Sequence, residues 1–268
     1  MALHAVGVSF ASRHPVRSSP ELVPAYVDAF TAASWHRPLR YFLGIIDAPK
    51  PAPRRPGVLK TKTLRAELAE LLTSDGLSTV TLLTSAKNDD RFAAFTAQTH
   101  LEPHYEFVRA YGRHYLNDEV LPAMDRWVLD MLAFAVAAKA AHGIVTVMNE
   151  DGAAAEVSYT GRSRDGRDLH PFPDEFERMC RVQREIGTKY VRFPRWGTMY
   201  SREHVDALGG VQRILDVVRP AVVRDLGDAI YFQLTEGVAT AMSAEAMQKQ
   251  RLFTELAGAL LPPVGARS

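Results

Sequence analysis

The order of strand-like and helix-like segments constrains the fold of this chain more than any single motif. Strand composition occurs at residues 3–11, 37–46, 77–85, 104–112, 143–149, 189–201, 221–227 and 228–236. Helical apolar spacing occurs at 18–34, 61–76, 117–143, 174–187 and 243–261. Because the two kinds of segment do not follow a strict βαβ alternation, we expect an α+β fold with a mixed, largely antiparallel sheet or sheets covered by helices. The Gly-Asp pair at 227–228 predicts a tight hairpin turn.

The domain organisation follows from chain length and from this order of segments. The 268 residues can bury a large core, because the buried fraction rises with chain length. We expect a single domain over residues 1–268. Residues 1–116 and 117–268 are candidate similar halves, since each combines strands with one or two covering helices, although the sequence contains no exact short repeat.

The most apolar segment, residues 127–141, is too short to cross a membrane. Asp130 and Lys139 bracket only eight uncharged residues, whereas a membrane span needs roughly 20. We therefore predict a core helix over 117–143. Acidic residues would stand in its first turn, and Lys139 and His142 in its last, as the helix dipole favours.

Composition excludes the strongly charged classes of protein. Lys and Arg number 32 against 31 Asp and Glu, so the net charge is +1. This balance is typical neither of a dedicated nucleic-acid binder, which is strongly basic, nor of an acidic mimic of nucleic acid. Cys180 is the single cysteine, so no internal disulfide forms. Its place in the helical pattern at 174–187 predicts a small buried packing residue. The first residues lack a signal-peptide pattern, and we expect a cytoplasmic protein.

A catalytic site and a structural element compete as readings of residues 196–216, WGTMYSREHVDALGGVQRILD. Ser201, His204 and Asp206 supply the residue types of a hydrolytic triad, but five consecutive residues rarely assemble one, and a GxSxG elbow is absent. Ser201 is also a natural N-cap for the helix that follows. Gly209 suits a helix C-cap with positive φ, and Gly210 allows a sharp reversal into the next helix. The structural reading is the stronger one.

Metal and nucleotide sites have no complete motif. His100 and His104 are four residues apart, but Pro103 between them disfavours a helix, and no HExxH motif or cysteine pair completes a zinc site. Neither GxGxxG nor GxxxxGK[ST] occurs. We expect no metal and no cofactor.

Residues 49–65 form a basic loop segment whose charge could attract a phosphate backbone. It holds six basic residues, Arg54 and Arg55 among them, and no acidic one. The segment has no aromatic residue on which a base could stack. A solvated loop or the rim of a protein interface is the better interpretation, with nucleic-acid binding as an alternative.

Four consecutive pieces near the C-terminus resemble a known family. They are WGTMYS at 196–201, HVDALGG at 204–210, VQRILDVV at 211–218 and VVRDLGDAIYFQLTEG at 222–237. Their order is similar to that in the C-terminal part of the type VI secretion immunity family (TsiV-like). The order is an aromatic segment, a serine, a short helix, Leu-Gly-Gly, a second helix and an R-x-Leu-Gly strand. The N-terminal strand, the Pro-led helix and RPLRYFLG are compatible with the same family. A related polymorphic-toxin immunity family is the alternative.

The resemblance implies a protein that binds a cognate secreted toxin and blocks its active site or substrate groove. VRR-Nuc-type nucleases are the toxins associated with that family, whose members have no cofactor and no catalysis of their own. Such inhibition needs an interface of roughly 1,200–2,000 Å² with aromatic and arginine anchors. The candidate toxin contacts are Arg162, Arg164, Asp165, Arg167 and Asp168 in the loop 161–170, followed by Arg54 and Arg55. A small-molecule hydrolase that uses Ser201 or His204 is the alternative function.

Overall fold

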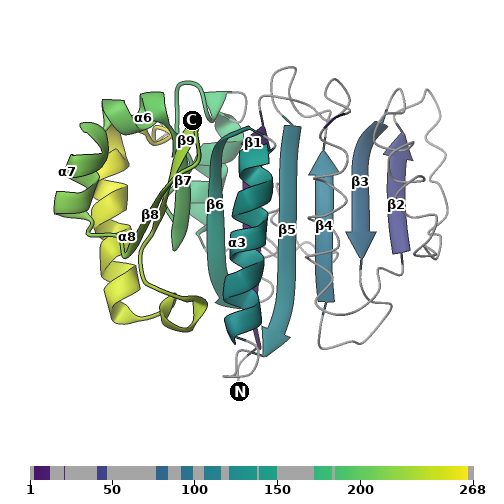
Figure 1. Ribbon diagram of the computed structural model, residues 1–268. Helices are drawn as coiled ribbons and strands as arrows, with labels where there is room; N and C mark the ends of the chain where they lie inside the picture. Colours follow the sequence, from purple (N-terminus) through teal and green to yellow (C-terminus); the bar gives the residue numbers. More distant parts are fainter. Residues whose placement is uncertain are drawn as a thin grey trace.

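A computed structural model describes residues 3–12, 21, 41–46, 77–83, 92–98, 106–115, 121–137, 139–149, 172–182 and 185–264. Within these ranges nine strands form one sheet in the order β2-β3-β4-β5-β1-β6-β7-β9-β8. Every pairing between neighbouring strands is antiparallel. Helices pack against this sheet (Figure 1), and the predicted α+β class is confirmed.

The strands are β1 (Leu3–Ser12), β2 (Tyr41–Ile46), β3 (Leu77–Leu83), β4 (Phe92–Gln98), β5 (Glu106–Tyr115), β6 (Ala140–Asn149), β7 (Gly197–Ser201), β8 (Val222–Asp225) and β9 (Ala229–Gln233). The helices are α3 (Leu121–Ala137), α5 (Pro173–Arg181), α6 (Arg202–Ala207), α7 (Gly210–Val217) and α8 (Ala244–Ala257), with the 3-10 turns η4 (Val238–Thr240) and η5 (Gly258–Leu260). The predicted hairpin turn at Gly227 is present, with φ of 85°.

β1, the first strand of the chain, lies in the middle of the sheet. Its residues pair with β5 on one side, from Leu3 with Tyr115 to Ser12 with Glu106. On the other side they pair with β6, from His4 with Asn149 to Ser12 with Ala140. β1 therefore connects the strands β2–β5 to the strands β6–β9.

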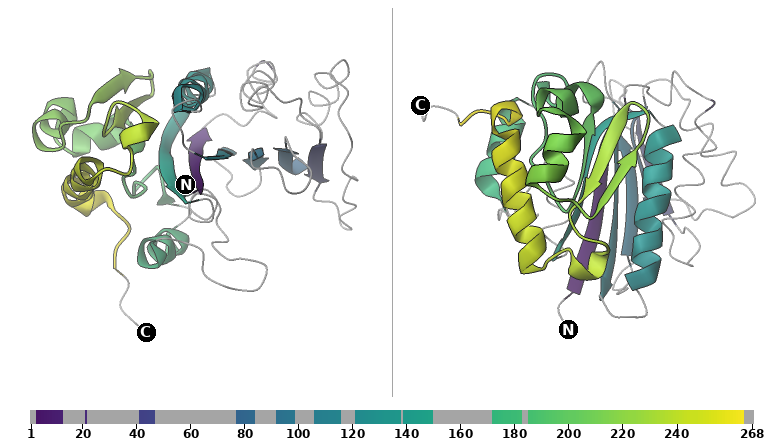
Figure 2. Two further views of the ribbon diagram at one scale, coloured as in Figure 1. Left: turned by 90° about the horizontal axis from the view of Figure 1, so that it is seen from below. Right: turned by 60° about the vertical axis from the view of Figure 1, so that its left-hand side comes forward.

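The two faces of the sheet are covered by different helices. Phe10 of β1 contacts Phe134 of α3, with 5.4 Å between the ring centroids. On the opposite face Phe253 of α8 packs between Tyr200 of β7 and Phe232 of β9, at 5.6 Å and 5.7 Å. Because side chains alternate along a strand, α3 and α8 lie on opposite sides of one sheet (Figure 2).

The helix α3 is shorter than the helix predicted over 117–143, so the predicted bounds were wrong. α3 ends at Ala137, Lys139 takes a left-handed backbone with φ of 49°, and β6 already begins at Ala140. Ala140 and Ala141 are good helix formers, but the pairing of β6 with β1 overrides that preference, as tertiary context often does. The first turn of α3 has no acidic residue and its last turn no basic one, and His142 belongs to β6, so the predicted charge pattern was wrong as well.

One strand was not predicted, and two predicted helices cannot be compared with the structure. The sequence did not predict β4, whose segment FAAFTAQ is rich in alanine, a residue depleted in strands. The predicted helix at 61–76 and nearly all of that at 18–34 lie outside the described residues. Within the described ranges, no helix combines the length and apolar character that a bilayer crossing needs.

Replacing Gly143 by alanine should destabilise the sheet centre. A Cβ there would lie 2.8 Å from both Cβ of Phe10 and the carbonyl oxygen of Ser9, and such overpacking costs about 1–3 kcal/mol. Gly258→Ala is the control, because a Cβ at Gly258 meets nothing within 4 Å. Urea unfolding should show a lower free energy of unfolding for Gly143→Ala only. Equal stability of the two variants would contradict the close packing of β1 on β6.

Candidate functional site

Ser201 and His204 form a hydrogen-bonded pair at the start of α6. The Ser201 hydroxyl lies 2.7 Å from His204 Nδ1, and the backbone N–H of His204 donates to the same hydroxyl oxygen at 3.4 Å. His204 Nε2 lies 3.2 Å from the carbonyl oxygen of Thr188. Because a carbonyl only accepts, Nε2 carries a proton, and in the neutral ring Nδ1 then accepts from Ser201. A backbone carbonyl thus orients the ring.

The position of this pair favours a structural role. Ser201 and His204 are 3% and 5% exposed, whereas Asp206 lies on the exposed side of α6. Both ring nitrogens of His204 are engaged without Asp206, and the Ser201 oxygen accepts the helix-capping bond. The prediction that Ser201 caps the helix is confirmed. Gly209 has φ of 95° and Gly210 of 85°, which confirms the predicted helix stop and reversal.

A second buried histidine lies against the same turn as His204. The turn contains Gly187, with φ of 85°, and a Cβ at that position would come within 2.2 Å of His142 Cδ2. His142 of β6, 1% exposed, therefore rests directly on the backbone of Gly187, and His204 holds the next residue, Thr188, by its carbonyl. The two histidines position the turn 185–190. Among the described residues no group of three His, Cys, Asp or Glu side chains could hold a metal ion.

Two buried arginines, which sequence reasoning missed, stabilise the irregular segment 191–196. Arg195, 2% exposed, pairs with Glu175 of α5 at 2.7 Å and stacks over the Phe172 ring at 4.5 Å. Arg192, 4% exposed, donates to Ser9 of β1 at 2.8 Å. Buried charges need such partners. An arginine between aromatic residues in the sequence RFPRW was the available signal, because guanidinium groups stack on aromatic rings.

The tyrosine hydroxyls beside this segment act as structural donors. The Tyr200 hydroxyl donates to the Arg192 carbonyl at 2.7 Å, and the Tyr231 hydroxyl donates to Gln233 Oε1 at 3.0 Å. Burial raises the pKa of both tyrosines far above the usual range, more than the nearby arginines lower it. Both hydroxyls therefore remain protonated at neutral pH and act as hydrogen-bond donors within the fold.

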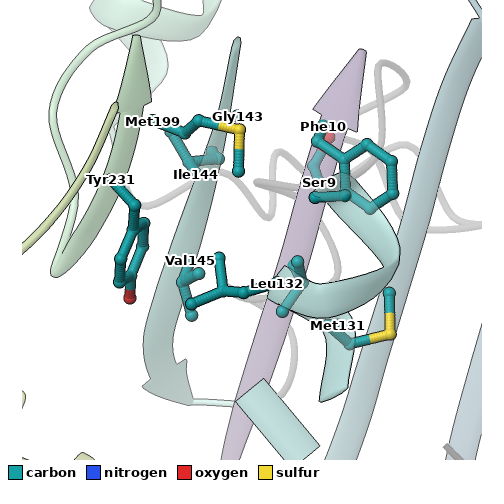
Figure 3. A pocket seen from close by; sticks show the side chains of 11 residues that line it. Ser9, Phe10, Met131, Leu132, Gly143, Ile144, Val145, Met199 and Tyr231 are labelled. Atoms are coloured by element: carbon teal, nitrogen blue, oxygen red, sulfur yellow. The ribbon is translucent and has the colours of Figure 1, made fainter. Parts of the chain in front are cut away.

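A pocket between α3 and the sheet is too small and too apolar for a substrate. Its volume is about 10 Å³, the space of about one water molecule. Figure 3 shows side chains from α3 and from β1, β6, β7 and β9 around it, among them Phe10, Met131, Val145, Met199 and Tyr231. The pocket is a packing gap of the core.

Cys180 is exposed on α5, so the prediction of a buried packing residue was wrong. The buried side of this short helix is formed by Met179 and by the half-buried Phe176, one turn before it. Cys180 lies one residue further, about 100° around the helix axis, since a helix has 3.6 residues per turn. Desolvation by its neighbours, and then the charge of Glu177, raise the pKa of the Cys180 thiol, which disfavours a reactive thiolate.

The hairpin of β8 and β9 is rigidly held at its tip. Arg202, the first residue of α6, donates from Nε to the Gly227 carbonyl at 2.6 Å and forms an ion pair with Asp225. The Gly227 N–H donates to Asp225 Oδ1 at 2.9 Å. The Gly227 N–H, followed by the side chain of Arg202, holds the pKa of the Asp225 carboxyl below its usual range. The hairpin end is thus a preformed, exposed structure.

The sequence-predicted interface residues cannot be placed relative to this hairpin. Arg162, Arg164, Asp165, Arg167, Asp168, Arg54 and Arg55 all lie outside the described residues, as do His100 and His104. Of the predicted sites, the structure brings together only Ser201 and His204, and it uses both as parts of the fold.

Comparisons with known proteins identify a structure with a similar fold. No family model matches the sequence, and no curated protein matches it. The structure is similar to that of the Pseudomonas aeruginosa T6SS protein PA0821, with a TM-score of 0.62 and 11% sequence identity. The likeness covers 100% of this chain and 77% of that one. At this identity the likeness establishes a shared fold.

Glu175→Gln should destabilise the protein because it removes the carboxylate that pairs with the buried Arg195. Removing one partner of a buried pair costs about 3–5 kcal/mol, and Glu175, 24% exposed, should give a value of about 2 kcal/mol or more after solvent screening. The control is Glu177→Gln on the same helix, whose ion pair with Arg181 is exposed and is worth below about 1 kcal/mol. Urea unfolding at pH 7 measures both. Similar losses would contradict the role of Arg195.

Cys180 should react more slowly with iodoacetamide at pH 8 than a free cysteine does, although it is exposed. A raised pKa leaves a smaller thiolate fraction at that pH, and the thiolate is the nucleophile. Glu177→Gln should speed the reaction, because it removes the nearby negative charge. A rate equal to that of free cysteine would contradict the raised pKa.

Proposed function

We propose that this chain is an immunity protein that binds a cognate toxin of a type VI secretion system and neutralises it. The observation that carries the proposal is the fold likeness to a T6SS protein over the full length of this chain. The resemblance of the C-terminal segments 196–237 to the type VI immunity family supports it independently, because that resemblance rests on the sequence alone.

The proposed activity is binding, without catalysis or cofactor. The Ser201–His204 pair is engaged in capping α6 and in holding the Thr188 carbonyl, and both side chains are buried. A hydrolase would need the hydroxyl to face a substrate space near an oxyanion site. The use of these residues by the fold favours a protein that acts through its surface.

In this proposal the chain covers the active site or substrate groove of the toxin. The family resemblance suggests that the toxin is a nuclease. A net charge of +1 provides little long-range steering towards a basic nuclease. Local anchors must then carry recognition. Arg162, Arg164, Arg167, Asp165 and Asp168, with Arg54 and Arg55, are the proposed contacts, since arginine is enriched at interface hot spots.

Co-expression with the product of the adjacent reading frame tests the proposal. We expect rescue of cells that this product otherwise kills and a stable 1:1 complex in size-exclusion chromatography with light scattering. The variant Arg162→Glu/Arg164→Glu/Arg167→Glu should weaken the complex by about tenfold or more if these residues are anchors. Its control is Arg251→Glu, which reverses an exposed charge on α8. If the wild-type chain gives neither a complex nor rescue, the immunity role is refuted.

A further inference from the structure

Among the described strands, β8 ends the sheet on the side opposite to β2 and pairs with β9 alone (Figure 1). Within the described residues its outer edge is therefore open. β9 is buried along its whole length, whereas Val223, Arg224 and Asp225 of β8 are exposed. Within the described part of the chain, every backbone hydrogen bond of residues 221–226 goes to β9 or its turn. An open edge accepts another strand.

The backbone register shows which peptide groups of β8 are available. The Leu226 N–H donates to the Ala229 carbonyl at the hairpin turn. Antiparallel pairs alternate between bonded and non-bonded positions, so the peptide groups of Arg224, two residues earlier, face β9. Those of Val223 and Asp225 face away from the sheet. They provide two N–H donors and two carbonyl acceptors on the outer edge.

This edge is preformed, so binding a strand there costs little ordering entropy. Arg202 holds both the Gly227 carbonyl and the Asp225 side chain from the start of α6. The strand behind it, β9, contributes Phe232 to the aromatic contact with Phe253 of α8. Affinity gained by preorganisation comes from such avoided costs.

The charges along the edge indicate what kind of strand it fits. Arg219 and Arg224 are exposed, and within the described residues neither has an ion-pair partner. Asp225 is neutralised by Arg202, and Asp228 lies at the tip, beyond the strand. Arg224 would occupy a non-bonded position opposite an added strand, where facing side chains are closest. An acidic residue opposite Arg224 is therefore favoured.

We propose that the outer edge of β8 binds an extended, acidic segment of the toxin by strand addition, which continues the sheet into the partner. The segment presents Asp or Glu opposite Arg224 and an apolar or β-branched residue opposite Val223, which is 36% exposed. The backbone hydrogen bonds provide affinity and the alternating side chains provide specificity. This proposal rests on the proposed immunity function and adds the edge of β8 to the contacts proposed above.

Val223→Pro tests strand addition directly. Proline removes the outward N–H of Val223, which the β8–β9 ladder does not use, and proline is tolerated on sheet edges at such positions. The matched control is Val223→Thr, which keeps the N–H and the β-branched shape. Affinity for the adjacent-frame product is measured by isothermal titration calorimetry, with circular dichroism and thermal unfolding of each free variant. We expect at least tenfold weaker binding for Val223→Pro and less than threefold change for Val223→Thr.

Hydrogen–deuterium exchange of the wild-type complex and Arg224→Glu provide readouts that do not depend on proline. Peptides covering 219–226 should gain protection on binding, and Arg224→Glu should weaken the complex at least fivefold, with a smaller effect at high salt. Full affinity of a folded Val223→Pro variant, or unchanged exchange at 219–226, would overturn the proposal. Dimerisation of the free chain that Val223→Pro abolishes would assign the edge to a second copy instead. If the wild-type chain does not bind the adjacent-frame product at all, the immunity function itself is refuted.

Discussion

The pairing of β1 with both β5 and β6 is the interaction on which the rest of the structure depends. β1 is the only strand that joins β2–β5 to β6–β9 within the described sheet, and it pairs over its full length on one side. Its side chains also reach both layers, Phe10 towards Phe134 of α3 and Ser9 towards Arg192. Contacts between segments so far apart in sequence carry a large loop-closure cost, which the burial of both faces must offset.

A network of buried polar groups connects this central strand to the C-terminal elements. Arg192 binds Ser9 and, through its carbonyl, the Tyr200 hydroxyl of β7. Arg195 binds Glu175 of α5 and lies two residues before β7. A fully satisfied buried network specifies one arrangement, because any shift leaves a charge or donor unpaired. The segment 191–196 can therefore remain irregular and yet position β7, β9 and β8.

The residues with the most reactive chemistry are used for architecture, and the exposed surface retains the capacity to bind. Ser201, His204 and His142 hold turns and helix starts. The hairpin of β8 and β9, in contrast, presents an open backbone edge with arginines that make no ion pair in the described part of the chain. An exposed, preformed edge can bind a partner without prior reorganisation, as the proposed immunity function requires.

The sequence by itself determined the local features of this protein. The Ser201 cap, the Gly209–Gly210 reversal, the turn at Gly227 and the α+β class all follow from interactions within a few residues or from side-chain periodicity. Only the tertiary structure decided that α3 ends at Ala137, that the Ala-rich β4 is a strand, that Cys180 is exposed and that β8 is the last of the described strands in the sheet. Each of these depends on which distant segment pairs with which, and that choice is made by burial and hydrogen bonding across the whole sheet and leaves no signal in the local sequence.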